Sequence, residues 1–345
     1  MQAIVFEAPR ALRLDTVSDP TIEHPRDALV RVRLTAVCGS DLHVYRGRET
    51  GLDAGTIMGH EFVGEVIERG ADVDLALGTP VVSPFTTSCG ACFYCERGLT
   101  ARCTEGALFG WVQDGRGLHG AQAELVRVPL ADSTLVPVPD GVDLEAALFT
   151  GDVLATGFFA ADRGGVGPGR RVAVVGCGPV GLMAALSARE LGAESVHAID
   201  TVPERLSLAA RYGATPVDSR TTDPAEAVRA ATDGRGADVV LEAVGTPEAT
   251  RLALDLARPG ATIVAVGVHT EAHFGFAPGE AYDKNLVYVA GRCSARAYME
   301  RLLARVGDLD VSAVVSHRLP LSEGVRAYDI FDKKLEGCTK AVLEA

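Results

Sequence analysis

The chain has a shortage of basic and aromatic residues. Its 33 lysines and arginines stand against 46 aspartates and glutamates, which gives a formal net charge of −13, and only 6% of its residues are aromatic. Nucleic acids and anionic membrane surfaces are both rich in negative charge, so a negatively charged protein binds them poorly. The composition therefore predicts neither a nucleic-acid partner nor a membrane partner.

The sequence also lacks an uninterrupted apolar run long enough to cross a membrane. The longest apolar stretch, residues 172–188, is broken by glycines and a proline, so it is read as a strand, a turn and a helix. The first ten residues show no basic segment followed by a long apolar one, so no secretory signal is expected. We expect a cytoplasmic protein, in which the eight cysteines are thiols or metal ligands rather than disulfides.

The length and the pattern of the chain predict two domains. With 345 residues, 47% of them hydrophobic, the chain exceeds the size of a single ordinary core. Residues 1–150 carry short strand-like runs between proline and glycine turns, which indicates a barrel-like, largely antiparallel β domain. Residues 151–292 alternate strands with helices, which indicates an α/β domain with a doubly wound parallel sheet. Residues 293–345 end in a strand-like run that we expect to return to the first domain.

A short segment of the first domain gathers side chains that can bind a metal and move a proton. Cys38, His60 and Glu61 offer sulfur, nitrogen and oxygen, and Ser40 and His43 lie close to them in sequence. Zn²⁺ accepts all three ligand types, and a catalytic zinc site keeps one position open beside three protein ligands. Each residue alone is more often a core residue, so the interpretation depends on the combination. The segment predicts a catalytic zinc centre.

Four cysteines follow within fifteen residues, at Cys89, Cys92, Cys95 and Cys103. The spacing C-x₂-C-x₂-C-x₇-C allows one loop to surround a zinc ion with four thiolates and no position for water. A C-x-x-C redox pair leaves the third and fourth cysteines unexplained, and the bacterial ferredoxin run places its last cysteine after three residues and before proline. We therefore predict a structural zinc lobe over residues 86–105.

A glycine turn opens the second domain. Gly176, Gly178 and Gly181 form G-x-G-x-x-G between a predicted strand and a predicted helix. Such glycines let backbone N–H groups approach a pyrophosphate at the helix N-terminus. Asp200 ends the next predicted strand, where a carboxylate accepts hydrogen bonds from ribose hydroxyls and repels a 2′-phosphate, which favours NAD over NADP. Arg205 is a nearby cation that argues in the other direction.

These motifs resemble those of the zinc-dependent medium-chain alcohol dehydrogenases over nearly the whole chain. The zinc signature of that family, G-H-E-x₂-G-x₅-G-x₂-V, runs here from Gly59 through Gly64 and Gly70 to Val73. The resemblance implies a GroES-like catalytic domain, a Rossmann domain that binds NAD, one catalytic and one structural zinc ion, and a small alcohol, aldehyde or ketone as substrate.

The resemblance also implies a ligand set for the catalytic zinc. Cys38 and His60 correspond to ligands throughout the family. Asp152 stands where many members have a cysteine and a bacterial branch has aspartate, so it becomes the third ligand; a helix cap is its other interpretation. Glu61 corresponds to a carboxylate that either lies behind the zinc or occasionally replaces water on it.

Further roles follow from the same resemblance. Ser40 would contact the substrate oxygen, and the proton would leave through Ser40, the cofactor ribose and His43. Phe85 and Trp111 match substrate-pocket positions, although core packing is the alternative for Trp111, the only tryptophan. The expected cofactor contacts are Thr156, Gly176, Gly178, Pro179, Val180, Gly181, Asp200, Arg205, Val266, Gly267, Val268 and Lys340.

Other functions fit the sequence less well. A polyol dehydrogenase of the sorbitol or threonine type uses the same metal and relay and is the nearest alternative. A metal-free quinone reductase typically lacks the zinc ligands and the cysteine lobe, which are both present here. A non-catalytic zinc and nucleotide-binding protein would show a broken ligand set or relay. A zinc hydrolase is disfavoured because the motif H-E-x-x-H is missing. Family members are usually dimers or tetramers, so we expect a homo-oligomer, with the strand at 286–290 as a candidate edge for pairing.

Overall fold

The computed structural model describes residues 1–345 as two compact units. The first unit comprises Met1–Ala155 and Ser294–Ala345, and the second comprises Thr156–Cys293. The sequence predicted boundaries at 150 and 292. Helix α4 (Val153–Arg163) begins in the first unit and continues into the second.

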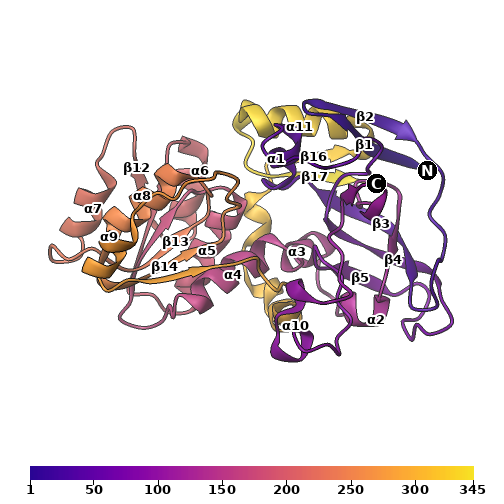
Figure 1. The fold of residues 1–345 in the computed structure, drawn as a ribbon, viewed down its shortest axis with the longest axis horizontal. Coiled ribbons are helices and arrows are strands. Elements are labelled where there is room, and N and C mark those ends of the chain that lie inside the picture. Colours follow the sequence, from indigo (N-terminus) through magenta and orange to yellow (C-terminus); the bar gives the residue numbers. More distant parts are fainter. The chain divides into compact units, whose positions relative to one another are not determined.

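A seven-stranded sheet forms the centre of the first unit (Figure 1). Its order is β16-β17-β3-β4-β5-β9, and β8 also pairs with β3. All pairs are antiparallel except β16 with β17. The last strand pairs with β3, so the final residues of the chain lie in the first unit. The bounds are β3 (Ala28–Ala36), β4 (Glu61–Arg69), β5 (Pro80–Ser83), β8 (Leu125–Val128), β9 (Val136–Pro137), β16 (His317–Pro320) and β17 (Ala341–Glu344).

The alternation of residue types along β3 explains how this sheet covers a core. Val30 and Val32 are buried, whereas Arg31 and Arg33, which alternate with them, are exposed, as a strand with side chains on opposite faces requires. On the neighbouring strand Phe62 packs edge-on against Phe109, with ring centroids 5.2 Å apart. Burying one such side chain stabilises the fold by about 1.5–3 kcal/mol.

Smaller elements complete the first unit. Helix α3 packs on the sheet and α10 packs on α3, and Leu148 and Met299 of these helices share one buried cluster with Val82 and Val342 of the sheet. Helix α10 ends at Leu303 and is followed by a 3₁₀ turn. The bounds are β1 (Gln2–Ala8), β2 (Ala11–Thr16), β6 (Trp111–Gln113), β7 (Arg116–Leu118), α1 (Asp41–Tyr45), α2 (Ala131–Thr134), α3 (Leu144–Thr150), α10 (Arg296–Leu303) and α11 (Gly324–Lys333); the 3₁₀ turns are η1 (Cys95–Arg97), η2 (Thr100–Arg102), η3 (Val306–Asp308), η4 (Val311–Val314), η5 (Leu321–Glu323) and η6 (Leu335–Gly337).

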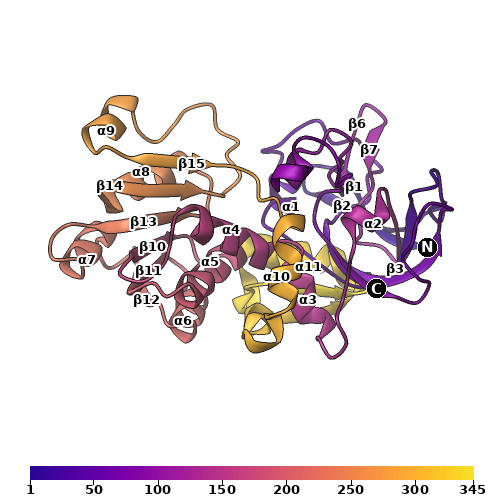
Figure 2. The same ribbon diagram turned by 90° about the horizontal axis from the view of Figure 1, so that it is seen from below.

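The second unit is built on a six-stranded parallel sheet of order β12-β11-β10-β13-β14-β15, which Figure 2 shows strand by strand. This order confirms the doubly wound fold. The direction of winding reverses between β10 and β13, and ligands of such sheets bind at the carboxyl ends of the strands beside the reversal. The bounds are β10 (Arg171–Val175), β11 (Ser195–Asp200), β12 (Thr215–Asp218), β13 (Ala237–Glu242), β14 (Ala257–Ala265) and β15 (Val287–Ala290).

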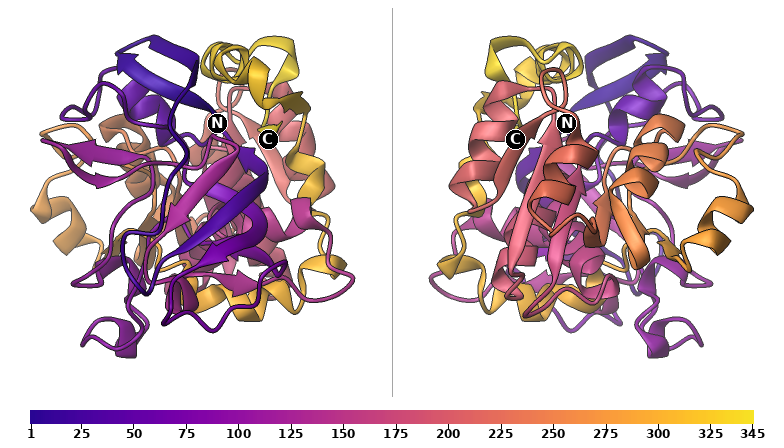
Figure 3. Two further views of the ribbon diagram at one scale, coloured as in Figure 1. Left: turned by 90° about the vertical axis from the view of Figure 1, so that its right-hand side faces the viewer. Right: turned by 90° about the vertical axis from the view of Figure 1, so that its left-hand side faces the viewer.

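Helices cover both faces of this sheet, as the right panel of Figure 3 shows. Helices α5 and α6 contact each other, and α7 contacts α8. Each of the helices α5 to α9 has proline in its first turn, where the fixed φ of proline suits a helix and no N–H is needed. The bounds are α5 (Pro179–Glu190), α6 (Pro203–Arg211), α7 (Pro224–Ala230), α8 (Pro247–Leu256) and α9 (Pro278–Asp283).

No single helix is long and apolar enough to cross a bilayer, and only α3 and α4, counted together across the break between them, meet the requirement.

Candidate metal centre and nucleotide turn

Four predicted metal-ligating side chains meet inside the first unit. Cys38, His60, Glu61 and Asp152 are all buried, and one donor atom of each lies within 4.8 Å of those of the other three. Asp152 Oδ2 is 3.5 Å from Cys38 Sγ and 3.2 Å from His60 Nε2. Cys38 precedes α1, His60 precedes β4 and Asp152 precedes α4, so the centre is assembled where these elements begin.

The imidazole of His60 is held from its other side by Asp41. His60 Nδ1 lies 3.2 Å from Asp41 Oδ1, while Nε2 faces Asp152. Burial lowers the pKa of His60, but the carboxylates of Asp41 and Asp152 outweigh burial, so the net shift is well upward. A carboxylate on the remaining ring nitrogen is the usual support of a metal-binding histidine, because it fixes the tautomer that leaves Nε2 free to bind a metal. Sequence reasoning overlooked Asp41.

The thiol of Cys38 shows the electrostatic demand of the site. Burial, followed by the charges of Asp152 and Glu61, raises the pKa of Cys38 to about 11. A thiolate at this position therefore needs a positive charge next to it. The donor set of sulfur, nitrogen and carboxylate oxygen suits Zn²⁺, and Glu61 Oε2 is buried without a hydrogen-bond partner. These observations fit a zinc ion held by Cys38, His60 and Asp152, with Glu61 at its side.

Glu61 has an ion pair with Lys340 from the last segment of the chain. Neither side chain is exposed, and Lys340 Nζ lies 2.5 Å from Glu61 Oε1. Burial lowers the pKa of Lys340, but Glu61 and Cys38 raise it by more, so the ammonium group stays charged. The sequence assigned Lys340 to the cofactor pyrophosphate, and the structure places its ammonium group on Glu61 instead of in solvent; its contact with a cofactor stays a prediction.

The two predicted relay residues lie beside the metal donors. Ser40 Oγ is 3.2 Å from His60 Nε2. His43 lies in α1, and its Nδ1 is buried without a hydrogen-bond partner. Burial, followed by the charges of Arg48 and Arg46, lowers the pKa of His43, which favours the neutral form able to accept a proton.

Of the two predicted pocket residues, one lies at the metal centre. Phe85 is buried, and its ring meets His60 edge-on with centroids 6.3 Å apart. Trp111 begins β6 and packs, partly buried, against the hydrophobic cluster that includes Phe6 and Tyr328. Its place in a substrate pocket stays a prediction.

The four cysteines of the lobe also come together. The sulfur atoms of Cys89, Cys92, Cys95 and Cys103 lie within 4.8 Å of one another at half-buried positions. Backbone N–H groups of Thr104 and Cys95 lower the pKa of Cys92 to about 5, which prepares a thiolate. Four sulfur atoms so close together fit a four-thiolate zinc ion.

The glycine turn of the second unit has the geometry of a nucleotide loop. Gly176 has φ +87°, and a Cβ at Gly181 would lie 1.7 Å from the carbonyl oxygen of Gly176, so both positions require glycine. Helix α5 begins at Pro179, because Gly178 caps it and the N–H of Leu182 already bonds to the carbonyl oxygen of Gly178. The N-terminus of α5, with Pro179 and Val180 in its first turn, therefore opens directly onto the turn.

Asp200 supports this turn from the end of β11. Its Oδ2 accepts the N–H of Cys177 at 2.6 Å, and its Oδ1 accepts the N–H groups of Thr201 and Val202. Arg205 Nη1 lies 4.0 Å from Asp200 Oδ2, and its Nε is buried without a partner. Asp200 thus shapes the loop as well as occupying the predicted ribose position.

Comparison with known proteins agrees with this arrangement. The family model of the alcohol dehydrogenase GroES-like domain matches residues 24–140, and that of the zinc-binding dehydrogenases matches residues 179–306. A zinc-type alcohol dehydrogenase B of Aspergillus flavus is 40% identical, over 96% of this chain and 79% of the relative. The chain belongs to the zinc-dependent medium-chain alcohol dehydrogenase family.

Two further similarities extend over whole chains. An alcohol dehydrogenase of Cupriavidus necator is 33% identical over 100% of this chain and 98% of the relative. The solved structure of alcohol dehydrogenase TADH from Thermus sp. ATN1 matches with a TM-score of 0.94 at 41% identity, and covers 100% of this chain and 99% of that one. As a member of this zinc-dependent alcohol dehydrogenase family, the chain is an oxidoreductase.

Within this alcohol dehydrogenase fold, a buried carboxylate joins the loops predicted to line the nicotinamide. Glu242 ends β13, and its Oε1 accepts the N–H groups of Val244 and Gly245. Its carbonyl oxygen accepts those of Val266 and Gly267, and its Oε2 lies 3.2 Å from His269 Nε2. Sequence reasoning named Val266, Gly267 and Val268 but not Glu242, which no motif singled out. Thr156 lies buried in α4.

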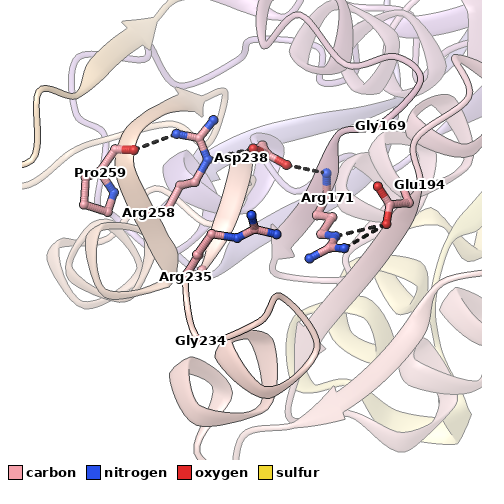
Figure 4. A pocket seen from close by; sticks show the side chains of 9 residues that line it. Gly169, Arg171, Glu194, Gly234, Arg235, Asp238, Arg258 and Pro259 are labelled. Atoms are coloured by element: carbon pink, nitrogen blue, oxygen red, sulfur yellow. Dashed lines mark hydrogen bonds and ion pairs between the residues drawn. The ribbon is translucent and has the colours of Figure 1, made fainter.

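A pocket of about 610 Å³ lies at the amino-terminal ends of the strands of the second unit, where β10, β13 and β14 begin (Figure 4). Arg171, Arg235 and Arg258 point into this region. Arg171 and Arg235 bond to Asp233, Arg171 also bonds to Glu194, and Arg258 bonds to Asp238 at 2.7 Å. Every guanidinium is therefore neutralised, and the pocket offers no surplus positive charge to the phosphates of a nucleotide.

Proposed function

We propose that this chain is an NAD-dependent dehydrogenase that interconverts a small or medium primary or secondary alcohol with its aldehyde or ketone. The observation that carries the proposal is the buried set of sulfur, nitrogen and oxygen donors with a serine hydroxyl touching it, Ser40 Oγ at 3.2 Å from His60 Nε2. A hydroxyl in that position can take the proton of a substrate oxygen that approaches the metal donors.

The bound groups would supply the two parts of the chemistry that protein side chains lack. A zinc ion acts as a Lewis acid toward an alcohol oxygen, and a nicotinamide accepts a hydride. Everything else is the task of the chain's own residues, which are to hold the donors, remove the proton and exclude water.

Ser40 and His43 suit the transfer of the proton. Ser40 has both a donor and an acceptor function, so it can accept the proton of the substrate while passing on its own. His43 has an unpartnered, buried Nδ1 and a lowered pKa, which makes it a proton acceptor near neutral pH. Arg46 and Arg48, whose charges help to lower that pKa, would hasten release of the proton to solvent.

The preference for NAD rests on Asp200. Its carboxylate lies at the end of β11, where a ribose 2′-phosphate would meet negative charge. Arg205 does not reverse this preference, because its guanidinium already faces the carboxylate at 4.0 Å. We infer that NADH binds more tightly than NADPH.

The substrate class follows from the few side chains near the donors. Phe85 presents an aromatic edge to His60, and Ser40 is the hydroxyl nearest to the metal position. An apolar wall with one polar group favours an alkyl or aryl alcohol over a polyol, whose extra hydroxyls would need further partners.

The proposal is tested with the purified protein and a panel of primary alcohols, secondary alcohols and polyols, by following NADH formation with NAD⁺ and NADPH formation with NADP⁺. Zinc per chain is measured on the same sample before and after treatment with a chelator. We expect activity with simple alcohols and NAD⁺, two zinc ions per chain for the two donor clusters, and loss of activity with the metal.

Other results would redirect the proposal. Turnover restricted to polyols would replace the simple alcohol by the polyol class. Two bound zinc ions without turnover of any alcohol, aldehyde or ketone would contradict the dehydrogenase and favour a binding role.

We also propose that the chain forms a homodimer or homotetramer through the edge of the second unit's sheet. Strand β15 lies at that edge, and Val287 on it is 53% exposed. An unpaired, apolar edge strand pairs readily with another chain, and a second copy is the partner always present.

A further inference from the structure

Gln122 is a fully buried amide close to the metal centre. Its side chain donates from Nε2 to the carbonyl oxygen of Ala36 at 3.1 Å and, at the longer distance of 3.5 Å, to Asp41 Oδ2. Its Oε1 accepts the hydroxyl proton of Tyr328 at 2.9 Å. A buried amide without partners would cost about 1–3 kcal/mol, and here each end has one.

The chemistry of these partners fixes the direction of every bond. The carbonyl of Ala36 and the carboxylate of Asp41 can only accept, so the amide must turn its NH₂ group toward them. Its carbonyl then faces Tyr328, which must donate. Burial, followed by the charge of Asp41, raises the pKa of Tyr328 well above its ordinary value, so the phenol keeps the proton that it donates.

The same carboxylate reaches two predicted metal ligands. Asp41 Oδ2 also accepts the backbone N–H of Cys38 at 2.9 Å, and Asp41 Oδ1 faces His60 Nδ1 at 3.2 Å. Asp41 lies at the start of α1 and is 5% exposed, so bulk water contributes little to the orientation of its carboxylate. Its orientation depends on the few groups that donate to it, and Gln122 is the side-chain donor behind it.

The backbone around Gln122 is bound to the segment that carries His60. The N–H groups of Ala121 and Gln122 bond to the carbonyls of Gly59 and Met58, at 3.0 and 2.8 Å. A Cβ at Gly59 would lie 2.4 Å from Cγ of Gln122, so the glycine before His60 makes room for this side chain. Gln122 therefore contacts the Cys38 side and the His60 side of the centre together.

We propose that Gln122 and Tyr328 are positioning residues of the metal centre, which hold Asp41 against His60 and Cys38 and thereby slow the release of zinc. Tyr328 lies in α11, so this helix of the returning C-terminal segment supports one side of the centre while Lys340 holds Glu61 on the other. The inference rests on the proposed function only in requiring that the Cys38 cluster binds zinc.

The experiment measures the transfer of zinc from the intact protein to a chromophoric chelator. The variants are Tyr328→Phe, Gln122→Met and the double variant, and the four-cysteine lobe in the same molecule is the internal reference. We expect each single exchange to release zinc from the Cys38 cluster about tenfold faster, at the low end of the effect of partners behind metal ligands, and to leave release from the lobe unchanged. With Co²⁺ in the Cys38 cluster, the visible absorption bands should shift in the same variants.

The double variant separates a chain of contacts from general loosening of the fold. The hydroxyl of Tyr328 bonds to Gln122 and also faces Asp41, so the effect of the double exchange should be smaller than the sum of the two single effects. Tyr45→Phe is the matched control, because its ring packs 5.6 Å from that of Tyr328 while its hydroxyl is outside the chain of bonds.

Three results would overturn the inference: unchanged zinc release and cobalt spectra in both single variants, additive effects in the double variant, or an equal effect of Tyr45→Phe. Zinc uptake by the lobe alone would overturn it as well. Lack of alcohol turnover together with the expected release rates would instead contradict the proposed function and leave the positioning role standing.

Discussion

Ser40 is the residue on which the proposed proton transfer depends. Its hydroxyl touches His60 Nε2 within the buried donor set. Ser40→Ala should lower turnover about 100-fold, because an acid–base group that contacts the reacting oxygen contributes roughly that much or more. Steady-state kinetics with a secondary alcohol and zinc analysis provide the measurement. Ser40→Thr is the control, since it keeps the hydroxyl. Undiminished turnover of the alanine variant would remove Ser40 from the mechanism.

Asp200 gives a second prediction for a single residue. Asp200→Asn should raise the Kd of NADH at least tenfold, because an amide has one acceptor oxygen in place of the two that receive three backbone N–H groups. Hydrogen bonds to charged groups contribute about 1.5–3 kcal/mol each. Fluorescence titration with NADH measures the change. The control is Asp218→Asn, which ends the neighbouring strand β12 and pairs with Arg220. Equal effects of both exchanges would contradict a special role for Asp200.

Individual residues also show where reading a sequence succeeds and fails. Cys38, His60, Glu61 and Asp152 could be named because zinc ligands have few residue types and the motifs place them in order, and the structure brings their donor atoms together. Asp41, Gln122 and Tyr328 carried no signal, because an ordinary buried polar residue gains a role only through neighbours far away in sequence. The pairing of Lys340 with Glu61 spans 279 residues and was equally hidden.

At the scale of elements, the proposed zinc ion of the cysteine lobe makes a prediction about stability. Cys92→Ser should leave one zinc ion per chain in place of two and lower the melting temperature by several degrees, since a loss of 1 kcal/mol shifts it by about 2–4 °C in a domain of this size. Metal analysis and scanning calorimetry measure both quantities. Phe93→Ala in the same loop, where the ring is 60% exposed, should preserve both zinc ions. Retention of both ions by the serine variant would contradict the four-cysteine site.

The contact of His269 with Glu242 joins the ends of β13 and β14 and makes a prediction about pH. The hydrogen bond to Glu242 raises the pKa of His269 in the folded protein above its ordinary 6.5. Its stabilising contribution is therefore complete below pH 6.5 and is lost as the pH rises through the folded pKa. The exchange His269→Gln should therefore lower the melting temperature by more at pH 6 than at pH 9.

The buried His197 of β11 provides a control of opposite sign. Burial lowers its pKa, so its contribution is present above pH 6.5 and is lost as the pH falls through the folded pKa. The exchange His197→Gln should accordingly lower the melting temperature by more at pH 9 than at pH 6. A pH-independent difference for His269→Gln would show that the imidazole does not titrate against Glu242.

The boundaries of helices and strands were predictable where the hydrophobic pattern and the turn residues indicate the same position. The second unit alternates strands with helices as predicted, because most of its strands are short apolar runs and its helices α5 to α9 begin with proline. Strand β12 (Thr215–Asp218) has no apolar run and was not predicted. Differences occur at ends. β14 begins at Ala257, although a sequence pattern treats Pro259 and Gly260 as a turn, because the backbone pairs with β13 on both sides of these two residues.

At the scale of the whole molecule, the proposed association through β15 can be tested by charge. Val287→Lys should shift the protein toward a smaller species in sedimentation velocity, because lysines along an edge strand oppose pairing. Val325→Lys, on α11 of the first unit and 39% exposed, is the matched control. The same mass for both variants would contradict the β15 contact. The sheet edge that pairs with another subunit cannot be predicted from the sequence alone, because hydrophobic periodicity indicates the buried face of a strand and not the chain with which it pairs.

The return of residues 294–345 to the first unit has a consequence for folding during synthesis on the ribosome. Synthesis proceeds from the N-terminus, so Cys38, His60 and Asp152 emerge long before Tyr328 and Lys340. The second unit is one continuous stretch and can fold as it appears, whereas the first unit lacks β17 from its sheet until residues 341–344 have been made. Glu61 therefore lacks its ion pair with Lys340 until then, and the proposed zinc cluster around Cys38 is completed late in synthesis.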